Sequence, residues 1–253
     1  MRIKMPEARV EDGYQFDAKF DWWTKDHLEN YRAVKRYFDE AMPGKALRCM
    51  EVGVFEGRSM IWFIRNFLCE RPASYYEAVE PDPAPFFMDN FKKLVKDYPD
   101  VTIHHYQEYS EFRLPDILGD IERSRGPEFD LMYYDGDHNA QGLLRDMVMG
   151  WELLKVGGVM LVDDYEMEAT DPWHYISHKE FQEHPRANFQ HPRAAVDAFL
   201  SIYRGLYDRL VDNFQVGLVK RVHLGAKNLD HGDETQGQNG EGKFEYHAKK
   251  EEI

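Results

Sequence analysis

The sequence has few cysteines, no long apolar run and no excess of positive charge, and each of these absences excludes a class of protein. Two cysteines in 253 residues, Cys49 and Cys69, are too few for a disulfide framework. Cys49 lies in an apolar stretch and Cys69 ends a predicted helix, so both are predicted to be buried, reduced thiols of an intracellular protein. No segment approaches the roughly 20 consecutive apolar residues of a membrane-spanning helix. Segment 1–16 lacks the apolar centre of a secretory signal, which favours a cytoplasmic protein with no membrane partner.

The charge balance is strongly acidic, with a formal net charge of −14. Such a protein repels a phosphate backbone, so the charge argues against a nucleic-acid substrate. The balance suits a small or neutral substrate and the binding of cations. A hydrophobic content of 43% in a chain of 253 residues is that of one globular domain with a large core. Whether the chain forms a homo-oligomer is left open.

Short apolar segments alternate with helical patterns along most of the chain. The predicted strands are 46–52, 74–83, 101–106, 129–138 and 157–166, and the predicted helices are Trp22–Met42, Met60–Leu68, Phe86–Tyr98, Pro115–Arg125, Leu143–Leu154 and Arg193–Tyr203. Two further strands, Tyr207–Phe214 and Gln215–Val222, close the pattern as an expected antiparallel pair. This alternation predicts an α/β fold: a Rossmann-like, doubly wound sheet, mostly parallel, with helices on both faces.

A glycine-containing turn follows the first of these strands, at 51–59. Gly53 can adopt backbone angles closed to other residues and lets a ligand approach the main chain. Gly57 and Ser59 begin a helix whose free N–H groups attract polar or anionic groups. The spacing E-x-G-x-x-x-G-x-S differs from G-x-G-x-x-G, so a dinucleotide is the weaker fit. Taken alone, two glycines that ease a tight strand–helix turn explain it equally well.

An acid ends the second strand at Glu80, 27 positions after Gly53. An acid at this place can bind both hydroxyls of a ribose, with Asp82 as the alternative. A solvated acid at a strand end is common, but the glycine turn and Glu80 together indicate adenosine binding.

Carboxylates follow two strands that should be neighbours in such a sheet. Asp135 ends one strand, and Asp163 and Asp164 end the next. Adjacent strands lie about 4.8 Å apart, so these acids should emerge side by side and repel each other unless a cation neutralises them. Oxygen ligands of this kind suit Mg²⁺, Mn²⁺ or Ca²⁺. The sequence therefore predicts Asp135, Asp163 and Asp164 as metal ligands, with helix or turn capping as the alternative.

Two residues beside this cluster are candidates for accepting a proton. Asp137 and His138 follow Asp135 closely, and histidine has the side chain whose ordinary pKa is nearest neutrality. A metal ion beside them would lower the pKa of a coordinated hydroxyl and orient it. Either residue could equally belong to the turn.

Four segments resemble the class I methyltransferases: EVGVFEGRS at 51–59, the Glu-Pro pair at 80–81, FDLMYYDGDH at 129–138 and the stretch 143–165. The likeness is closest to the metal-dependent O-methyltransferases of macrolide and aminocoumarin sugars, and it covers about 46–222. D-G-D-H with the later D-D pair is its most specific part. The resemblance implies S-adenosylmethionine (SAM) as methyl donor and a catalytic magnesium. It implies donor contacts at Glu51, Gly53, Gly57, Ser59, Glu80 and Ser110, metal at Asp135, Asp163 and Asp164, and Asp137 ahead of His138 as the base.

The expected organisation is an N-terminal helical and aromatic cap (1–45), a SAM-binding methyltransferase domain (46–224) with an insert at 166–192, and a disordered tail (225–253). Aromatic and histidine residues of the cap and the insert either cover a substrate or pack against the core or another subunit; they are Tyr14, Phe16, Phe20, Trp22, Trp23, Trp173, His174, Tyr175 and His178.

The leading hypothesis is a SAM-dependent O-methyltransferase of a small molecule, such as a natural-product sugar. A nicotinamide-dependent oxidoreductase of the same fold is the alternative, but Phe55 and Glu56 would make its pyrophosphate turn crowded and acidic. A non-catalytic SAM-binding protein is a third hypothesis, and the acids at both strand ends argue against it.

Overall fold

The computed structural model describes residues 7–19, 24–124, 128–167 and 191–222. Within these ranges, no helix combines the length and the apolar character needed to cross a membrane. The tail at 225–253 and nearly all of the insert lie outside the described residues.

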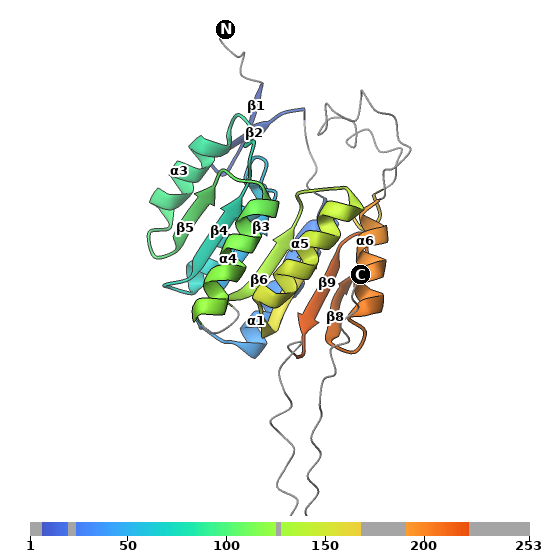
Figure 1. Ribbon diagram of the computed structural model, residues 1–253. Helices are drawn as coiled ribbons and strands as arrows, with labels where there is room; N and C mark the ends of the chain where they lie inside the picture. Colours follow the sequence, from blue (N-terminus) through green and yellow to red (C-terminus); the bar gives the residue numbers. More distant parts are fainter. Residues whose placement is uncertain (1–6, 20–23, 125–127, 168–190, 223–253) are drawn as a thin grey trace, which may run out of the picture.

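A seven-stranded sheet in the order β5-β4-β3-β6-β7-β9-β8 forms the centre of the fold (Figure 1). Its strands are β3 (Arg48–Val52), β4 (Tyr75–Val79), β5 (Thr102–Tyr106), β6 (Phe129–Tyr134), β7 (Leu154–Val162), β8 (Tyr207–Asp212) and β9 (Val216–Lys220). The strands from β3 to β7 pair in parallel, β9 runs antiparallel to β7, and β8 runs antiparallel to β9. The predicted Rossmann-like sheet with an antiparallel end is confirmed.

Helices cover both faces of the sheet, as predicted. They are α1 (Lys25–Ala41), α2 (Arg58–Asn66) and α3 (Phe87–Asp97) on one face, and α4 (Ser110–Ser124), α5 (Ala140–Leu153) and α6 (Pro192–Ile202) on the other. The strand β6 shows why two layers form: its residues are all buried, with Leu131 and Tyr133 in the core beneath α1 and α2, and Met132 and Tyr134 in the core beneath α5 and α6. Alternate side chains of one strand thus fill both cores.

The first helix starts where its capping residues place it. Thr24 caps α1: its side chain accepts the N–H of His27, and the His27 ring accepts the N–H of Thr24. Tyr31, Val34 and Phe38 then follow at helical spacing and are buried. The predicted helix is confirmed, with its start moved from Trp22 to Lys25.

A β-hairpin precedes α1, where the sequence predicted none. Its strands β1 (Ala8–Glu11) and β2 (Tyr14–Asp17) are joined at Asp12 and Gly13, which both have positive φ, as a two-residue hairpin turn requires. Tyr14 and Phe16 are 2% and 3% exposed and belong to the core on the α2 side. These two aromatics therefore pack the core. The other aromatic and histidine candidates for substrate cover, at positions 20, 22, 23 and 173–178, lie outside the described residues.

Two local predictions need correction. Cys49 is buried as expected, but Cys69 is exposed, because α2 ends at Asn66 and a short 3₁₀ turn (Leu68–Glu70) carries the thiol to the surface. The helix α4 begins at Ser110 and includes Pro115, whereas the sequence placed its start at that proline.

Candidate functional site

The glycine turn and the acids lie along one rim of the sheet. At the carboxyl ends of the strands, the N–H of Asp135 donates to the carbonyl of Val52 (2.8 Å), and the N–H of Asp163 donates to the carbonyl of Tyr134 (2.9 Å). The ends of β3, β6 and β7 are thus adjacent, and the loops that follow them face the same space. The predicted juxtaposition of residues 51–59, 135–138 and 163–164 is what the structure shows.

Two positions of the turn are glycines with positive φ. Gly53 has φ +83°, and a Cβ there would lie 2.0 Å from the carbonyl oxygen of Asp135. Gly57, which precedes the first residue of α2, also has φ +83°, and a Cβ there would lie 2.9 Å from Cε of Met60. At Gly53 both the positive φ and the backbone contact require glycine, whereas at Gly57 the positive φ favours glycine and the flexible Met60 side chain could move.

A buried carboxylate supports the turn from below. Glu51 is fully buried; one of its oxygens accepts the Ser59 hydroxyl, and the other accepts the Tyr76 hydroxyl at 2.6 Å. Burial raises the pKa of Glu51 to about 7, against the lowering effect of these two hydrogen bonds. Glu51 and Ser59 therefore tie the end of β3 to the first turn of α2.

The Glu80 carboxylate lies against the same turn. One oxygen accepts the backbone N–H groups of Val54 and Phe55, each at 3.0 Å, and the other accepts the N–H of Asp82, also at 3.0 Å. The Glu80 carboxyl group, the first choice for ribose, thus lies beside the glycine turn, and Asp82 contacts it through its backbone N–H.

A pocket lies between the glycine turn and Asp135, and residues of α1 form one of its walls. It is lined by His27, Tyr31, Val54, Phe55, Glu56, Arg58, Ser59, Tyr133 and Asp135. Sequence reasoning missed His27 and Tyr31, because the periodicity of α1 marked its apolar positions only as core. The position of His27 three residues after a capping threonine is the one sequence feature that could have singled it out.

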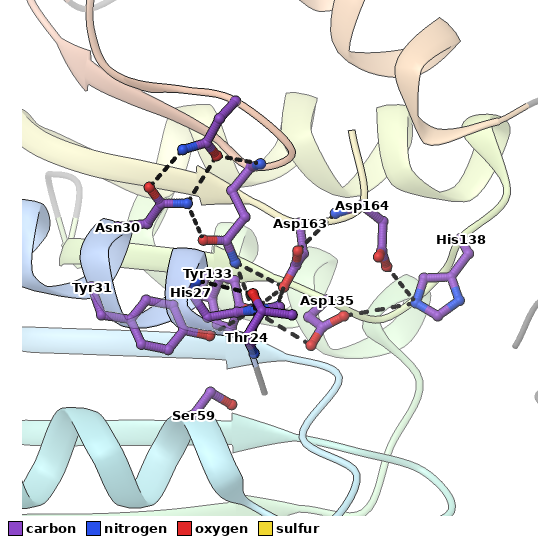
Figure 2. A network of polar contacts seen from close by, with 12 residues as sticks. Thr24, His27, Asn30, Tyr31, Ser59, Tyr133, Asp135, His138, Asp163 and Asp164 are labelled. Carbon is purple, nitrogen blue, oxygen red and sulfur yellow. Dashed lines mark hydrogen bonds and ion pairs between the residues drawn. The ribbon is translucent and has the colours of Figure 1, made fainter. Parts of the chain in front are cut away.

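Asp135, His138 and Asp164 converge on one point of the rim (Figure 2). Nε2 of His138 lies 3.0 Å from an oxygen of Asp164 and 3.7 Å from an oxygen of Asp135. Asp164 has φ +59°, a conformation rare for residues other than glycine and frequent at functional sites. Ligand atoms of the three residues all lie within 4.8 Å of one another, a spacing that one cation could bridge.

Asp163 lies deeper than the other two aspartates. Its Oδ2 accepts the Tyr133 hydroxyl and Nε2 of Gln215 (2.9 Å), and its Oδ1 accepts the N–H of Asp164 (2.8 Å). The three predicted ligands are therefore close in space, but His138 rather than Asp163 completes the cluster that the side chains form.

Asp137 and Ser110 make contacts away from this cluster. Asp137 accepts the N–H of Asn139 at 2.9 Å, and its other oxygen fills the space beside Gly142, where a Cβ would lie only 1.8 Å away. The Ser110 hydroxyl donates to Asp146 of α5 at 2.6 Å. Both side chains thus join structural contacts at α5. Of the two candidate bases, His138 is the one that faces the acids.

Like charges shape the ionisation of the cluster. Burial and the charges of Asp163 and Asp164 raise the pKa of Asp135 well above its ordinary value. Burial would lower the pKa of His138, but the carboxylates of Asp164 and Asp135 outweigh it and hold that pKa well above its ordinary value. The carboxylates thus favour the protonated form of the His138 ring.

Comparisons with known proteins agree with the geometry. A protein-family model described as a methyltransferase domain matches residues 50–165. This range includes the glycine turn, together with Asp135, Asp163 and Asp164. No curated protein matches the sequence significantly. Among solved structures, the fold is similar to that of MycE methyltransferase from the mycinamycin biosynthetic pathway in complex with Mg and SAH (S-adenosylhomocysteine), at 14% identity and a TM-score of 0.50 over 81% of this chain and 52% of that one. This chain therefore spans about half the length of MycE.

A second MycE structure, with Mg, SAH and mycinamycin VI, gives 14% identity and a TM-score of 0.50 over 81% of this chain and 51% of that one. An O-methyltransferase from Bacillus cereus in complex with SAH gives 14% identity and a TM-score of 0.47 over 78% of this chain and 83% of that one. At such identities, the MycE likeness bears on the fold alone. Residues 50–165 thus match a methyltransferase domain, and the sheet order and the glycine turn agree with that match.

Proposed function

We propose that the protein is an O-methyltransferase that methylates a hydroxyl of a small molecule beside a divalent metal ion, Mg²⁺ being the first choice. The observation that carries the proposal is one pocket lined both by the glycine turn and by Asp135, with His138 and Asp164 clustered at Asp135. A methyl donor and a metal-bound hydroxyl could meet there.

The turn supplies the donor side. Gly53 and Gly57 leave the backbone open to close approach, and the N-terminus of α2 offers N–H groups and a positive dipole end. Glu80 is assigned to the ribose of the donor. The ribose hydroxyls would donate hydrogen bonds to its carboxylate, which already faces the turn. SAM brings a methyl group on a sulfonium, a good leaving group, so the chain has mainly to position a nucleophile and remove its proton.

The acid cluster fits a hard cation. Asp135 and Asp164 offer carboxylate oxygens within reach of one point. Asp163 adds a third carboxylate, whose Oδ1 accepts the N–H of Asp164. Such oxygen donors suit Mg²⁺. Bound there, the ion would lower the pKa of an acceptor hydroxyl. MycE, which shares the fold, holds Mg and SAH in its structure, which supports the assignment.

His138 is proposed as the base. Its Nε2 faces Asp135 and Asp164, and a cation on these carboxylates would compensate the charge that otherwise keeps the imidazole protonated. In the reaction, the acceptor oxygen forms a bond to the methyl carbon, the carbon–sulfur bond breaks, and the hydroxyl proton passes to Nε2. His138 would position the hydroxyl as well as accept its proton.

The acceptor is proposed to be a hydroxylated small molecule, such as a sugar of a natural product. The sequence resemblance favours it, one MycE structure contains mycinamycin VI, and the net charge of −14 disfavours nucleic acid.

The test uses SAM labelled on the methyl group, the full-length chain and a panel of glycosylated and phenolic acceptors, with Mg²⁺ or with EDTA. We expect label in an ether product only with Mg²⁺, and calorimetric binding of SAH but not of NAD⁺. Methylation that persists after chelation would refute the metal-assisted mechanism. SAH binding with no label transferred to any acceptor would favour a non-catalytic SAM-binding protein.

A further inference from the structure

Three side chains of α1, at positions 27, 30 and 31, are connected by polar contacts to the carboxylate of Asp163. These positions lie on one face of the helix, since residues three and four apart are neighbours there. Each side chain leads by a separate route to Asp163, at the end of β7 (Figure 2).

The first route is direct. Nε2 of His27 lies 3.6 Å from Oδ2 of Asp163, and Nδ1 of the same ring lies 2.7 Å from the hydroxyl of Thr24. The neutral ring that accepts the Thr24 N–H at Nδ1 carries its proton on Nε2, the atom that faces Asp163. The helix cap thus sets the direction of this imidazole.

The second route passes through two phenols. The Tyr31 hydroxyl donates to the Tyr133 hydroxyl at 2.9 Å, and the Tyr133 hydroxyl donates to Oδ2 of Asp163. The same Tyr133 oxygen lies 3.5 Å from Oδ2 of Asp135. One phenol therefore lies between two acids of the cluster.

The third route passes through an amide. Nδ2 of Asn30 donates to Oε1 of Gln215 at 2.8 Å, and Nε2 of Gln215 donates to Oδ2 of Asp163 at 2.9 Å. Asn30 also exchanges two hydrogen bonds of 2.9 Å with Asn213. The turn between β8 and β9 is thus tied to the same carboxylate.

This polar network lies inside the hydrophobic core. Asn30, Tyr31, Tyr133 and Gln215 are at most 4% exposed, and both tyrosine rings belong to the hydrophobic core beneath α1. Buried polar groups gain little net stability even when fully paired, and apolar side chains would serve the core as well. A function in orienting Asp163 explains why polar groups occupy these core positions.

We propose that Tyr31 and Tyr133, together with His27, Asn30 and Gln215, are positioning residues that hold Asp163 and Asp135 in the arrangement that binds the metal ion. The inference rests on the proposed metal-assisted function. It assigns to α1 a part in the active site, because three of the five positioning residues, His27, Asn30 and Tyr31, come from this helix. Hydrogen bonds to ligating carboxylates commonly set metal affinity in this way.

Mn²⁺ is the probe, added alone to the full-length chain, with the free ion followed by electron paramagnetic resonance. Tyr133→Phe removes the hydroxyl between the two acids and leaves the ring, so Mn²⁺ affinity should fall about tenfold. Tyr31→Phe leaves Tyr133 in place but removes its donor, so a smaller fall is expected. Affinity for SAH, measured by calorimetry, should fall less than Mn²⁺ affinity in both variants, because neither substitution touches the glycine turn.

The control is Tyr134→Phe, the same substitution one residue along β6. The Tyr134 side chain lies in the core beneath α5, and its hydroxyl donates to Sδ of Met132 at 3.6 Å. It should bind Mn²⁺ like the wild type. Unchanged Mn²⁺ affinity in both Tyr31→Phe and Tyr133→Phe would overturn the inference. If Tyr133→Phe does not fold, Tyr31→Phe alone decides. A wild-type chain that takes up no Mn²⁺ would refute the metal-assisted function and this inference with it.

Discussion

The α-carbon of Gly53 lies so close to the backbone carbonyl of Asp135 that no side chain fits between them. A Cβ on Gly53 would lie 2.0 Å from the Asp135 carbonyl oxygen and 2.5 Å from the α-carbon of Gly136. The donor turn and the first metal-ligand candidate are therefore in backbone contact. A change that moves one of them should move the other.

Gly53→Ala should therefore damage both functions. The contact is with backbone, which cannot rotate away, so we expect a loss of about 2 to 5 kcal/mol in the free energy of unfolding, of which about 1 to 2 kcal/mol comes from the positive φ alone. SAH affinity and Mn²⁺ affinity should both fall, as measured by calorimetry. Gly205→Ala is the control, because Gly205 has φ +86° with no atom within 4 Å of the added Cβ. Equal effects of the two variants on binding would contradict this account.

Asn90 links the N-terminal hairpin to the donor turn. It is 2% exposed; its Nδ2 donates to the carbonyls of Gln15 (2.7 Å) and Glu56 (3.0 Å), and its Oδ1 accepts the N–H of Gln15 (2.8 Å). Asn90→Ala leaves these backbone groups without partners, which should cost about 2 to 4 kcal/mol in the free energy of unfolding. SAH affinity should fall as the turn loosens, while Mn²⁺ affinity should not.

The matched control for Asn90 is Asn66→Ala. Asn66 is exposed and has one hydrogen bond, to the carbonyl of Trp62 at 3.0 Å. Its SAH affinity should equal that of the wild type. If Asn90→Ala also bound SAH like the wild type, the hairpin would have no part in holding the turn.

The sheet and the meeting of its acids were predictable because they follow from periodicity. Apolar strands buried on both faces indicate a parallel sheet, and the ends of parallel strands share an edge. Asp135 and Asp163 therefore had to be neighbours once β6 and β7 were recognised, and the structure pairs these strands in the expected way.

The directions of side chains beyond the strand ends were not predictable in this way. Asp137 and His138 lie in a loop with no period, and contacts with α5 and with Asp164 decide which of them faces the acids. His27 is polar and lies outside the apolar stripe of α1, so only the packing of α1 on the sheet shows that its ring lies beside Asp163. The hairpin was missed for a different reason: its strands have only four residues each.

Glu51 should make stability depend on pH. Its pKa rises from 4.5 to about 7 on folding because of burial, so the folded state binds more protons between these values and the free energy of unfolding falls as pH increases through them. The full loss is about 3 kcal/mol and is complete above pH 7. Urea denaturation from pH 4.5 to 8 should show this decline in the wild type relative to Glu51→Gln, which cannot ionise. Parallel curves for the two proteins would show that the carboxylate keeps its ordinary ionisation when folded.

His138 and Asp137 can be separated by paired amide substitutions. In His138→Asn the proton acceptor is lost, so kcat on an acceptor found by the labelled-methyl assay should fall about 10²- to 10⁴-fold. In Asp137→Asn the side-chain carbonyl can still accept the N–H of Asn139, so the turn should persist and kcat should change little. SAH affinity should be preserved in both variants, which shows that the donor turn is intact. A large fall in kcat for Asp137→Asn with normal turnover for His138→Asn would reverse the assignment, because the carboxylate would then have to leave its contact with α5 and accept the proton itself.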